Sequence, residues 1–303
     1  MDLHLLTQML NALLMLAMPL GLVIYLTHTW KLGWRLWFIG MATFVLSQVG
    51  HFPFLWLSTL IMNRPPIVNV FLSMPQSRLT IFNGIFVGLA AGLFEELFRY
   101  GMYRWWAKEA RSWRTGILTG VGHGGAEAII AGSLAFYSFL QMLAYRNIDL
   151  SAVISAEQLP VASYWSTAWY DAFLASFERL SAIIIQISMA VLVLQNFARK
   201  QWFWVWLAVL YHAIVDFFTV PAGAGDISKY GAEAILGGFA ILSIFIIFAL
   251  RRPEPVVTTQ PNTPVATFGA ASLKPVETTP DNLNSSENAK RRASGRDSFI
   301  HPN

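Results

Sequence analysis

Seven long apolar stretches leave this chain few choices of fold. A membrane-spanning helix needs about 20 apolar residues, and the 303 residues are 55% hydrophobic and only 13% charged. Because lipid offers backbone groups no hydrogen-bond partner, these stretches must be helices. We predict an all-α, polytopic integral membrane protein, multi-pass in the cell membrane, with the bacterial plasma membrane as its expected location. We expect about seven transmembrane helices, at Leu5–Thr27, Trp34–Ile61, Leu79–Trp105, Gly116–Tyr145, Phe173–Phe197, Trp202–Val220 and Ala232–Leu250.

The composition changes at Arg251. Residues 251–303 are rich in Pro, Thr, Ser and Asn and show no hydrophobic periodicity, which is typical of disordered segments. The sequence therefore predicts one transmembrane helical domain over residues 1–250 and a disordered cytoplasmic tail over residues 251–303.

Basic residues gather at one set of span ends, which predicts the orientation. Ten follow the odd-numbered spans, whereas four lie on the opposite side. Because cytoplasmic loops carry the excess of Lys and Arg, we expect the N-terminus outside and the C-terminus in the cytoplasm. The ten are Lys31, Arg35, Arg104, Lys108, Arg111, Arg114, Arg199, Lys200, Arg251 and Arg252.

Two functional classes are excluded by composition. The chain has no cysteine, so thiolate nucleophiles, thiolate metal sites and disulfides are absent. The basic residues stand singly at the ends of apolar runs rather than in a patch, so nucleic-acid binding has no support.

The stretch GLFEELFRYG, residues 92–101, places ionisable groups inside the third predicted span. Each such group costs on the order of 2.5–3.5 kcal/mol near the middle of a membrane helix. Glu95 and Arg99 are four residues apart, so an internal ion pair is expected to offset part of that cost, and Glu96 is left without a local partner. Glu96 continues a row of small residues that suits close helix packing, so we expect it to face the protein interior. The row is Gly84, Gly88 and Gly92.

Two further spans each carry a histidine with a carboxylate one turn later. His123 precedes Glu127 beside a second row of glycines, and His212 precedes Asp216. Counted from the cytoplasmic ends at 1.5 Å per residue, both histidines and Glu96 lie roughly 12–15 Å deep. Three polar clusters are thus predicted to meet at one level. The second row is Gly116, Gly120 and Gly124.

Histidines and carboxylates in a lipid-shielded site suit hydrolysis by an activated water. Zn²⁺ takes imidazole nitrogens and carboxylate oxygens while a nearby Glu serves as base. In a metal-free version, a buried Glu and one His activate the water, and the second His donates to the oxyanion. Two alternatives stay open, namely a transporter that uses the cluster as a proton or cation relay and a scaffold in which the charges only set helix packing.

The three motifs resemble the YhfC-type intramembrane metalloproteases, within the superfamily of CAAX prenyl endopeptidases and bacteriocin self-immunity proteins. The resemblance rests on EELFRY at 95–100, HGGAE at 123–127 and HAIVD at 212–216, and ERLSA at 178–182 also resembles a segment of that family. It implies cleavage of a peptide bond in a membrane-embedded or membrane-associated substrate. The CAAX enzymes have three residues between the paired glutamates and the arginine, whereas this chain has two. The spacing therefore leaves open whether Glu95 or Glu96 is the base.

The combined hypothesis is an intramembrane peptidase with a water bound to a metal, expected to be zinc. The expected catalytic residues are Glu96 (or Glu95) as the water-activating carboxylate, Arg99 holding Glu95, and His123. The expected metal ligands are His123 and His212, with Asp216 or Glu127 completing the shell. For Glu178 and Arg179 a structural ion pair is at least as good an interpretation, and His51 is interpreted as a packing residue.

Overall fold

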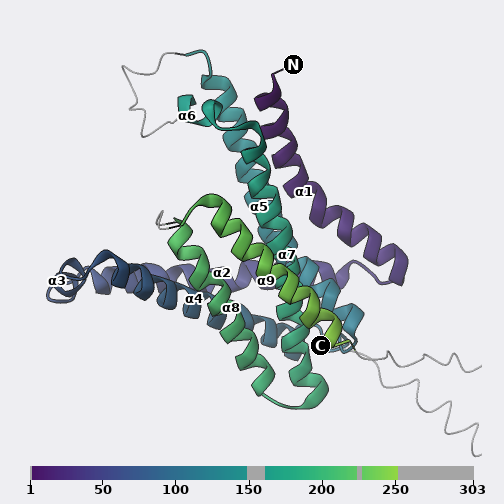
Figure 1. Ribbon diagram of the computed structural model, residues 1–303. Helices are drawn as coiled ribbons and strands as arrows, with labels where there is room; N and C mark the ends of the chain where they lie inside the picture. The colour runs from purple at the N-terminus through teal and green to yellow at the C-terminus, as the bar shows by residue number, and fades with distance from the viewer. Residues whose placement is uncertain (1, 149–160, 224–226, 252–303) are drawn as a thin grey trace, which may run out of the picture. The chain divides into compact units, whose positions relative to one another are not determined.

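The computed structural model describes residues 2–148, 161–223 and 227–251, and every regular element in these ranges is helical (Figure 1). The all-α prediction is confirmed. The predicted tail lies outside the described residues, apart from Arg251. The elements are α1 (Leu3–Trp30), α2 (Arg35–Met62), α3 (Ile67–Leu72), α4 (Gln76–Gly101), η1 (Met102–Trp106), α5 (Trp113–Tyr145), α6 (Val161–Ser166), η2 (Trp169–Asp171), α7 (Ala172–Arg199), α8 (Phe203–Gly223) and α9 (Lys229–Ala249).

Six of the described helical segments are long and apolar enough to cross a membrane. They contain α1, α2, α4, α5, α7 and α9, each of which coincides with a predicted span. The remaining predicted span coincides with α8, whose 21 residues measure about 30 Å at 1.5 Å per residue. The count of seven and the orientation of the termini stay predictions.

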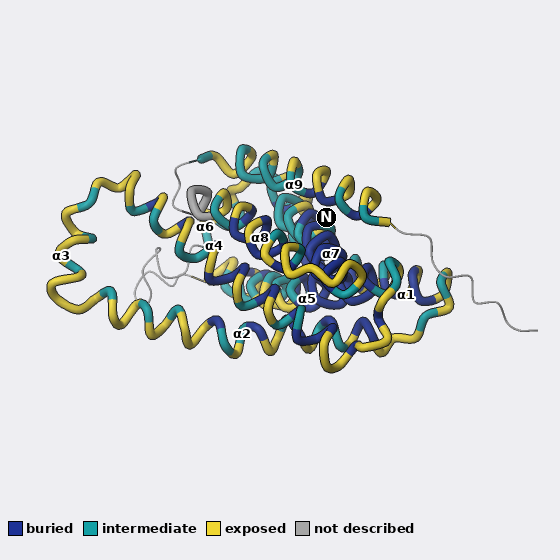
Figure 2. Tube along the Cα trace, turned by 90° about the horizontal axis from the view of Figure 1, so that it is seen from below, coloured by how far each residue is buried: buried dark blue, intermediate teal, exposed yellow. Residues whose placement is uncertain are grey.

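Helix α7 lies at the centre of the helical packing. In its most apolar stretch 78% of the residues are buried, against 39% or less in the other five spanning segments. It packs against α1, α5, α8 and α9, and its dark blue trace in Figure 2 shows the burial. A helix that is apolar on all sides is stable only when other helices or lipid surround it, and α7 is surrounded mainly by protein.

The glycine rows mark where the helices approach one another most closely. Gly88 and Gly92 of α4 lie against the backbone of α8, where an added Cβ would stand 2.5 Å from the Ala213 carbonyl oxygen and 2.7 Å from that of Val209. The second row, on α5, faces α7 in the same way, with Gly120 against the Cα of Ile187. Small residues at a four-residue spacing bring backbones this close in membrane proteins. The sequence-based expectation of two close-packing rows is confirmed.

These contacts place the polar segments of α4, α5 and α8 around one region. Helix α5 also crosses α2 through a close contact that the glycine rows did not predict: a Cβ on Gly122 would stand 2.1 Å from the Trp37 carbonyl oxygen. Since Gly122 precedes His123, this crossing fixes the depth at which His123 lies.

Candidate functional site

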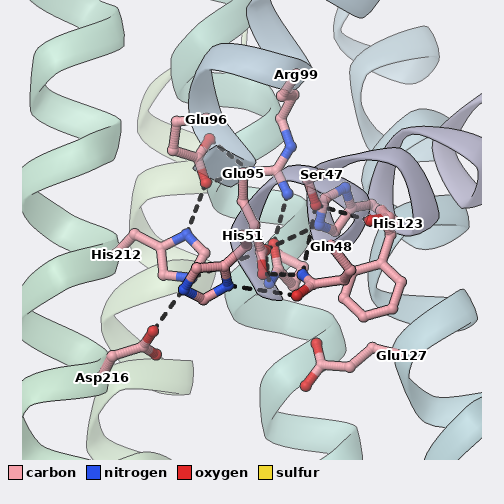
Figure 3. A network of polar contacts seen from close by, with 12 residues as sticks. Ser47, Gln48, His51, Glu95, Glu96, Arg99, His123, Glu127, His212 and Asp216 are labelled. Carbon is pink, nitrogen blue, oxygen red and sulfur yellow. Dashed lines mark hydrogen bonds and ion pairs between the residues drawn. The ribbon is translucent and has the colours of Figure 1, made fainter. Parts of the chain in front are cut away.

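The site is a network of polar side chains buried between α2, α4, α5, α7 and α8 (Figure 3). The network includes Glu95, Glu96 and Arg99 from α4, His123 from α5, Gln186 from α7, and His212 with Asp216 from α8. Their prediction as one cluster was made from depth alone, and the structure does bring Glu95, Glu96, Arg99, His123, His212 and Asp216 together.

Glu96 is completely buried, with 0% of its side chain exposed, and Arg99 balances its charge. Nη1 of Arg99 donates to both carboxylate oxygens at 2.7 Å, and Nδ1 of His212 lies 2.8 Å from Oε1. The expectation that Arg99 holds Glu95 is therefore wrong. Positions three and four residues away are both neighbours on a helix, so the sequence spacing allowed either partner.

Glu95 is held by neutral groups instead of a guanidinium. Its Oε1 accepts from Nε2 of Gln48 at 2.9 Å, and its Oε2 accepts from Nε2 of Gln186 at 3.1 Å. Nε2 of His123 lies 3.0 Å from the same Oε2, and Nε2 of His212 lies 3.8 Å from it. Glu95 thus stands between the two imidazole rings.

The ring of His212 connects three carboxylates. Nδ1 faces Glu96, whereas Nε2 faces both Oε2 of Glu95 at 3.8 Å and Oδ2 of Asp216 at 3.6 Å. Both separations exceed a direct hydrogen bond, and both suit a water molecule that bonds to the two groups at once. With Nδ1–H donating to Glu96, the neutral ring leaves Nε2 as an acceptor. The neutral tautomer with its proton on Nδ1 is the form of the ring that can take a proton from water.

Glu127 lies on the far side of the same region and is paired with a cation. Nη1 of Arg179 donates to its Oε1 at 2.5 Å, and Arg179 also pairs with Glu178. The structural ion pair considered for Glu178 and Arg179 is present, and Glu127 belongs to it. All three line a cavity of about 90 Å³ together with His212 and Asp216.

The small cavity adjoins a larger one. A cleft of about 390 Å³, mainly apolar, lies between α7, α8 and α9, and it shares four lining residues with the small cavity. The shared residues are Glu178, Val215, Thr219 and Leu236. The cleft and the small cavity at His212 and Asp216 thus adjoin along these four residues.

Sequence reasoning missed two glutamines of the network. Gln186 donates to Glu95 and accepts from Nη2 of Arg99 at 2.5 Å, so it links the two halves of the site. Gln48 holds the other oxygen of Glu95. The prediction rested on ionisable residues, and glutamine is not ionisable. The sequence signal for Gln186 is an amide side chain within the apolar run IIIQIS at residues 183–188. His51 stacks on Phe94 at 5.6 Å, as a packing residue does, and its Nδ1 lies 3.3 Å from Gln48.

The donor types suit a zinc ion, but their present arrangement does not. Among the residues that the structure describes, no three His, Cys, Asp or Glu side chains are grouped so that they could hold an ion. A zinc-bound histidine fixes its second nitrogen with a hydrogen bond, whereas the buried Nδ1 of His123 has no partner within the described ranges. Glu127 is already held by Arg179. These side chains therefore do not form a zinc site as they are arranged here.

The fold and the site define a class: a polytopic, helical membrane protein with a buried acid–histidine site. Within that class, the chain belongs to the YhfC intramembrane metalloprotease family, whose model matches residues 14–236 and so contains every residue of the network. It is 29% identical over 246 residues to the uncharacterized membrane protein YhfC of Bacillus subtilis (strain 168), covering 78% of this chain and 92% of that protein.

No solved structure matches the chain. The description of the matched family names a metalloprotease. These comparisons give no support to the alternative that the protein is a transporter. The protein is a multi-pass membrane protein in contact with the lipid bilayer.

Proposed function

We propose that the protein is an intramembrane peptidase, which hydrolyses a peptide bond of a membrane-embedded or membrane-associated substrate. One observation carries the proposal: His212 is held by Glu96 through Nδ1 and turns Nε2 toward Glu95 and Asp216 at the wall of a cavity. The family description supports the reaction class.

Glu96 and Arg99 position the histidine in this mechanism. Arg99 fixes both oxygens of Glu96, and Glu96 fixes the ring of His212 with Nε2 as the acceptor. A carboxylate that orients an imidazole in this way prepares it as a general base. Glu96, expected from the sequence as the base, therefore acts through His212 in this proposal.

Glu95 and Asp216 place the water. One oxygen of each carboxylate lies within 3.8 Å of Nε2 of His212, so a water between them donates one proton to the ring and the other to a carboxylate. As the water oxygen bonds to the substrate carbonyl carbon, Nε2 takes its proton. The same proton passes to the amine nitrogen when the C–N bond breaks. His123 and Gln186 hold Glu95 in place.

The larger cleft between α7, α8 and α9 gives the substrate its route. Its lining is mainly apolar and it adjoins the small cavity at His212, with which it shares four lining residues. An extended peptide segment leaving the lipid can therefore approach the water along a mainly apolar wall, which also carries Glu178, Lys229 and Glu233.

Zinc stays a prediction alongside this scheme. The family description names a metalloprotease, and the predicted ligands remain His123 and His212 with Asp216 or Glu127. Metal analysis of the purified protein, described in the Discussion, tests it.

A cleavage screen tests the proposal. Purified protein in liposomes is incubated with a library of tagged transmembrane peptides, and products are identified by mass spectrometry. His212→Gln and Glu95→Gln are expected to lose at least about 100-fold in rate, which is the scale of general-base catalysis. The matched controls His28→Gln and Glu109→Gln, both exposed and outside the network, should retain it. Unchanged cleavage in His212→Gln would refute the proposed role.

A further inference from the structure

A third cavity, of about 420 Å³, shares no lining residue with the other two, and its charged lining residues are all basic. It is formed where α4 continues into η1, α7 ends and α8 begins. Four cations line it, Arg104, Lys108, Arg111 and Lys200, and none of its lining residues is acidic. Glu109, which neighbours Lys108 in the sequence, pairs with Arg35 instead. The basic cavity therefore holds positive charge that its own walls do not balance.

Arg111 is built into the wall of the basic cavity. Its guanidinium donates to the carbonyl oxygens of Ala107, Ala110 and Tyr103 at 2.8–3.1 Å and lies 4.6 Å above the ring of Phe197. The pKa of Arg111 is lowered, mainly by burial and further by the charge of Arg104. A cation fixed in this way next to a second cation is arranged for an anion.

All four cations reach the cavity from exposed positions. Arg104 stands on η1, a π-helical turn closed by the Ala107 N–H to Met102 carbonyl bond at 2.9 Å. Such turns are rare and occur frequently at functional sites. Lys200 ends α7 in the left-handed conformation, with φ of 57°, and lines the cavity together with Trp202.

Aromatic rings place the basic cavity at the level of lipid headgroups. Tyr100 packs against Trp202 at 4.5 Å and against Phe197 at 5.2 Å, and all three line the cavity. Trp105 and Trp202 are exposed beside it, at 63% and 52%. Exposed tryptophans at span ends mark the membrane–water interface, where phospholipid phosphates lie.

We propose that the basic cavity binds the phosphate of an anionic phospholipid headgroup. Arg and Lys form strong charge-assisted hydrogen bonds to phosphate, and basic pockets between membrane helices bind such headgroups. The aromatic wall accommodates the glycerol and the first acyl carbons. Free inorganic phosphate shares the same chemistry, so the experiment separates the two sources.

Thermal unfolding in detergent micelles tests the proposal. The probes are phosphatidylglycerol, phosphatidylcholine and inorganic phosphate at matched ionic strength. Saturating phosphatidylglycerol is expected to raise Tm by about 5 °C, as a ligand at roughly 100 times its Kd does for a chain of this size. Phosphatidylcholine is expected to raise it much less. Native mass spectrometry counts the lipid molecules retained.

The variant Arg104→Gln/Lys200→Asn removes two exposed cations without touching Arg111. Asn tolerates the left-handed backbone, and Lys31→Asn is the matched control, since Lys31 also ends a helix with φ of 54° but lies outside the cavity. The double variant should lose the lipid-induced rise, the control should keep it, and Lys108→Gln should show an intermediate rise. A full rise in the double variant, or an equal rise with phosphatidylcholine, overturns the proposal. A matching rise with inorganic phosphate alone overturns the lipid as the source.

Discussion

Replacement of Arg99 by methionine removes the charge that balances the most deeply buried carboxylate. The Arg99 side chain is 1% exposed and that of Glu96 is 0% exposed. Without the guanidinium, Glu96 keeps only its contact with His212, and the Gln186 amide oxygen loses its donor. Removing one partner of a buried ion pair costs about 3–5 kcal/mol because the other charge stays uncompensated. The unsatisfied amide oxygen places Arg99→Met toward the upper end of that range.

A second substitution isolates the electrostatic cause. Glu96→Gln/Arg99→Met replaces the stranded charge by a neutral amide, so we expect about 2 kcal/mol or more of the loss to be recovered, within the coupling range of residues in contact. The assay is denaturant unfolding in micelles followed by circular dichroism. Arg35→Met is the control, because the Arg35–Glu109 pair is more than half exposed and such pairs contribute at most about 1 kcal/mol.

Two outcomes would refute the reasoning. A free energy of unfolding for Arg99→Met within about 1 kcal/mol of wild type would mean that Glu96 does not depend on the guanidinium. A double variant as unstable as the sum of the two single variants would mean that the loss comes from packing rather than from charge.

Two further predictions concern packing and the metal. Gly122→Ala, whose methyl would meet the Trp37 carbonyl oxygen at 2.1 Å, is expected to cost about 1–3 kcal/mol or more by overpacking; Gly21→Ala, with nothing within 4 Å of its Cβ, should leave thermal unfolding unchanged within about 1 kcal/mol. Elemental analysis of wild type purified without chelators tests the zinc prediction, which expects about one equivalent of zinc, lost in His123→Ala/His212→Ala. Wild type without stoichiometric metal contradicts the zinc prediction and is the result that the scheme with His212 as the base expects.

The helices of this protein were predictable because their signal is local. Each span is recognisable from its length and apolar composition, and an apolar segment of about 20 residues satisfies its own backbone hydrogen bonds in lipid as a helix. The sides of α4 and α5 that pack against other helices could also be predicted, since glycines such as Gly88 and Gly120 permit the close approach that the structure shows. The crossing of α2 and α5 at Gly122 could not be predicted, because Gly122 belongs to neither of the two four-residue glycine rows.

The residues of the site were also readable, because charge inside an apolar segment is costly and stands out. Their pairing was not. Arg99 had Glu95 and Glu96 within equal reach on its own helix, and the choice fell to neighbours from other helices, with His212 beside Glu96 and Gln186 between Glu95 and Arg99.

The sequence by itself thus predicted which segments are long and apolar enough to cross a membrane, and which ionisable side chains inside them are costly enough to stand out. Only the tertiary structure decided which donor bonds to which oxygen. It pairs Glu127 with Arg179 and brings the four cations of the basic cavity together. The physical reason is range: insertion into lipid depends on about 20 consecutive residues, whereas a hydrogen bond depends on positions within about 3 Å that distant parts of the chain set together.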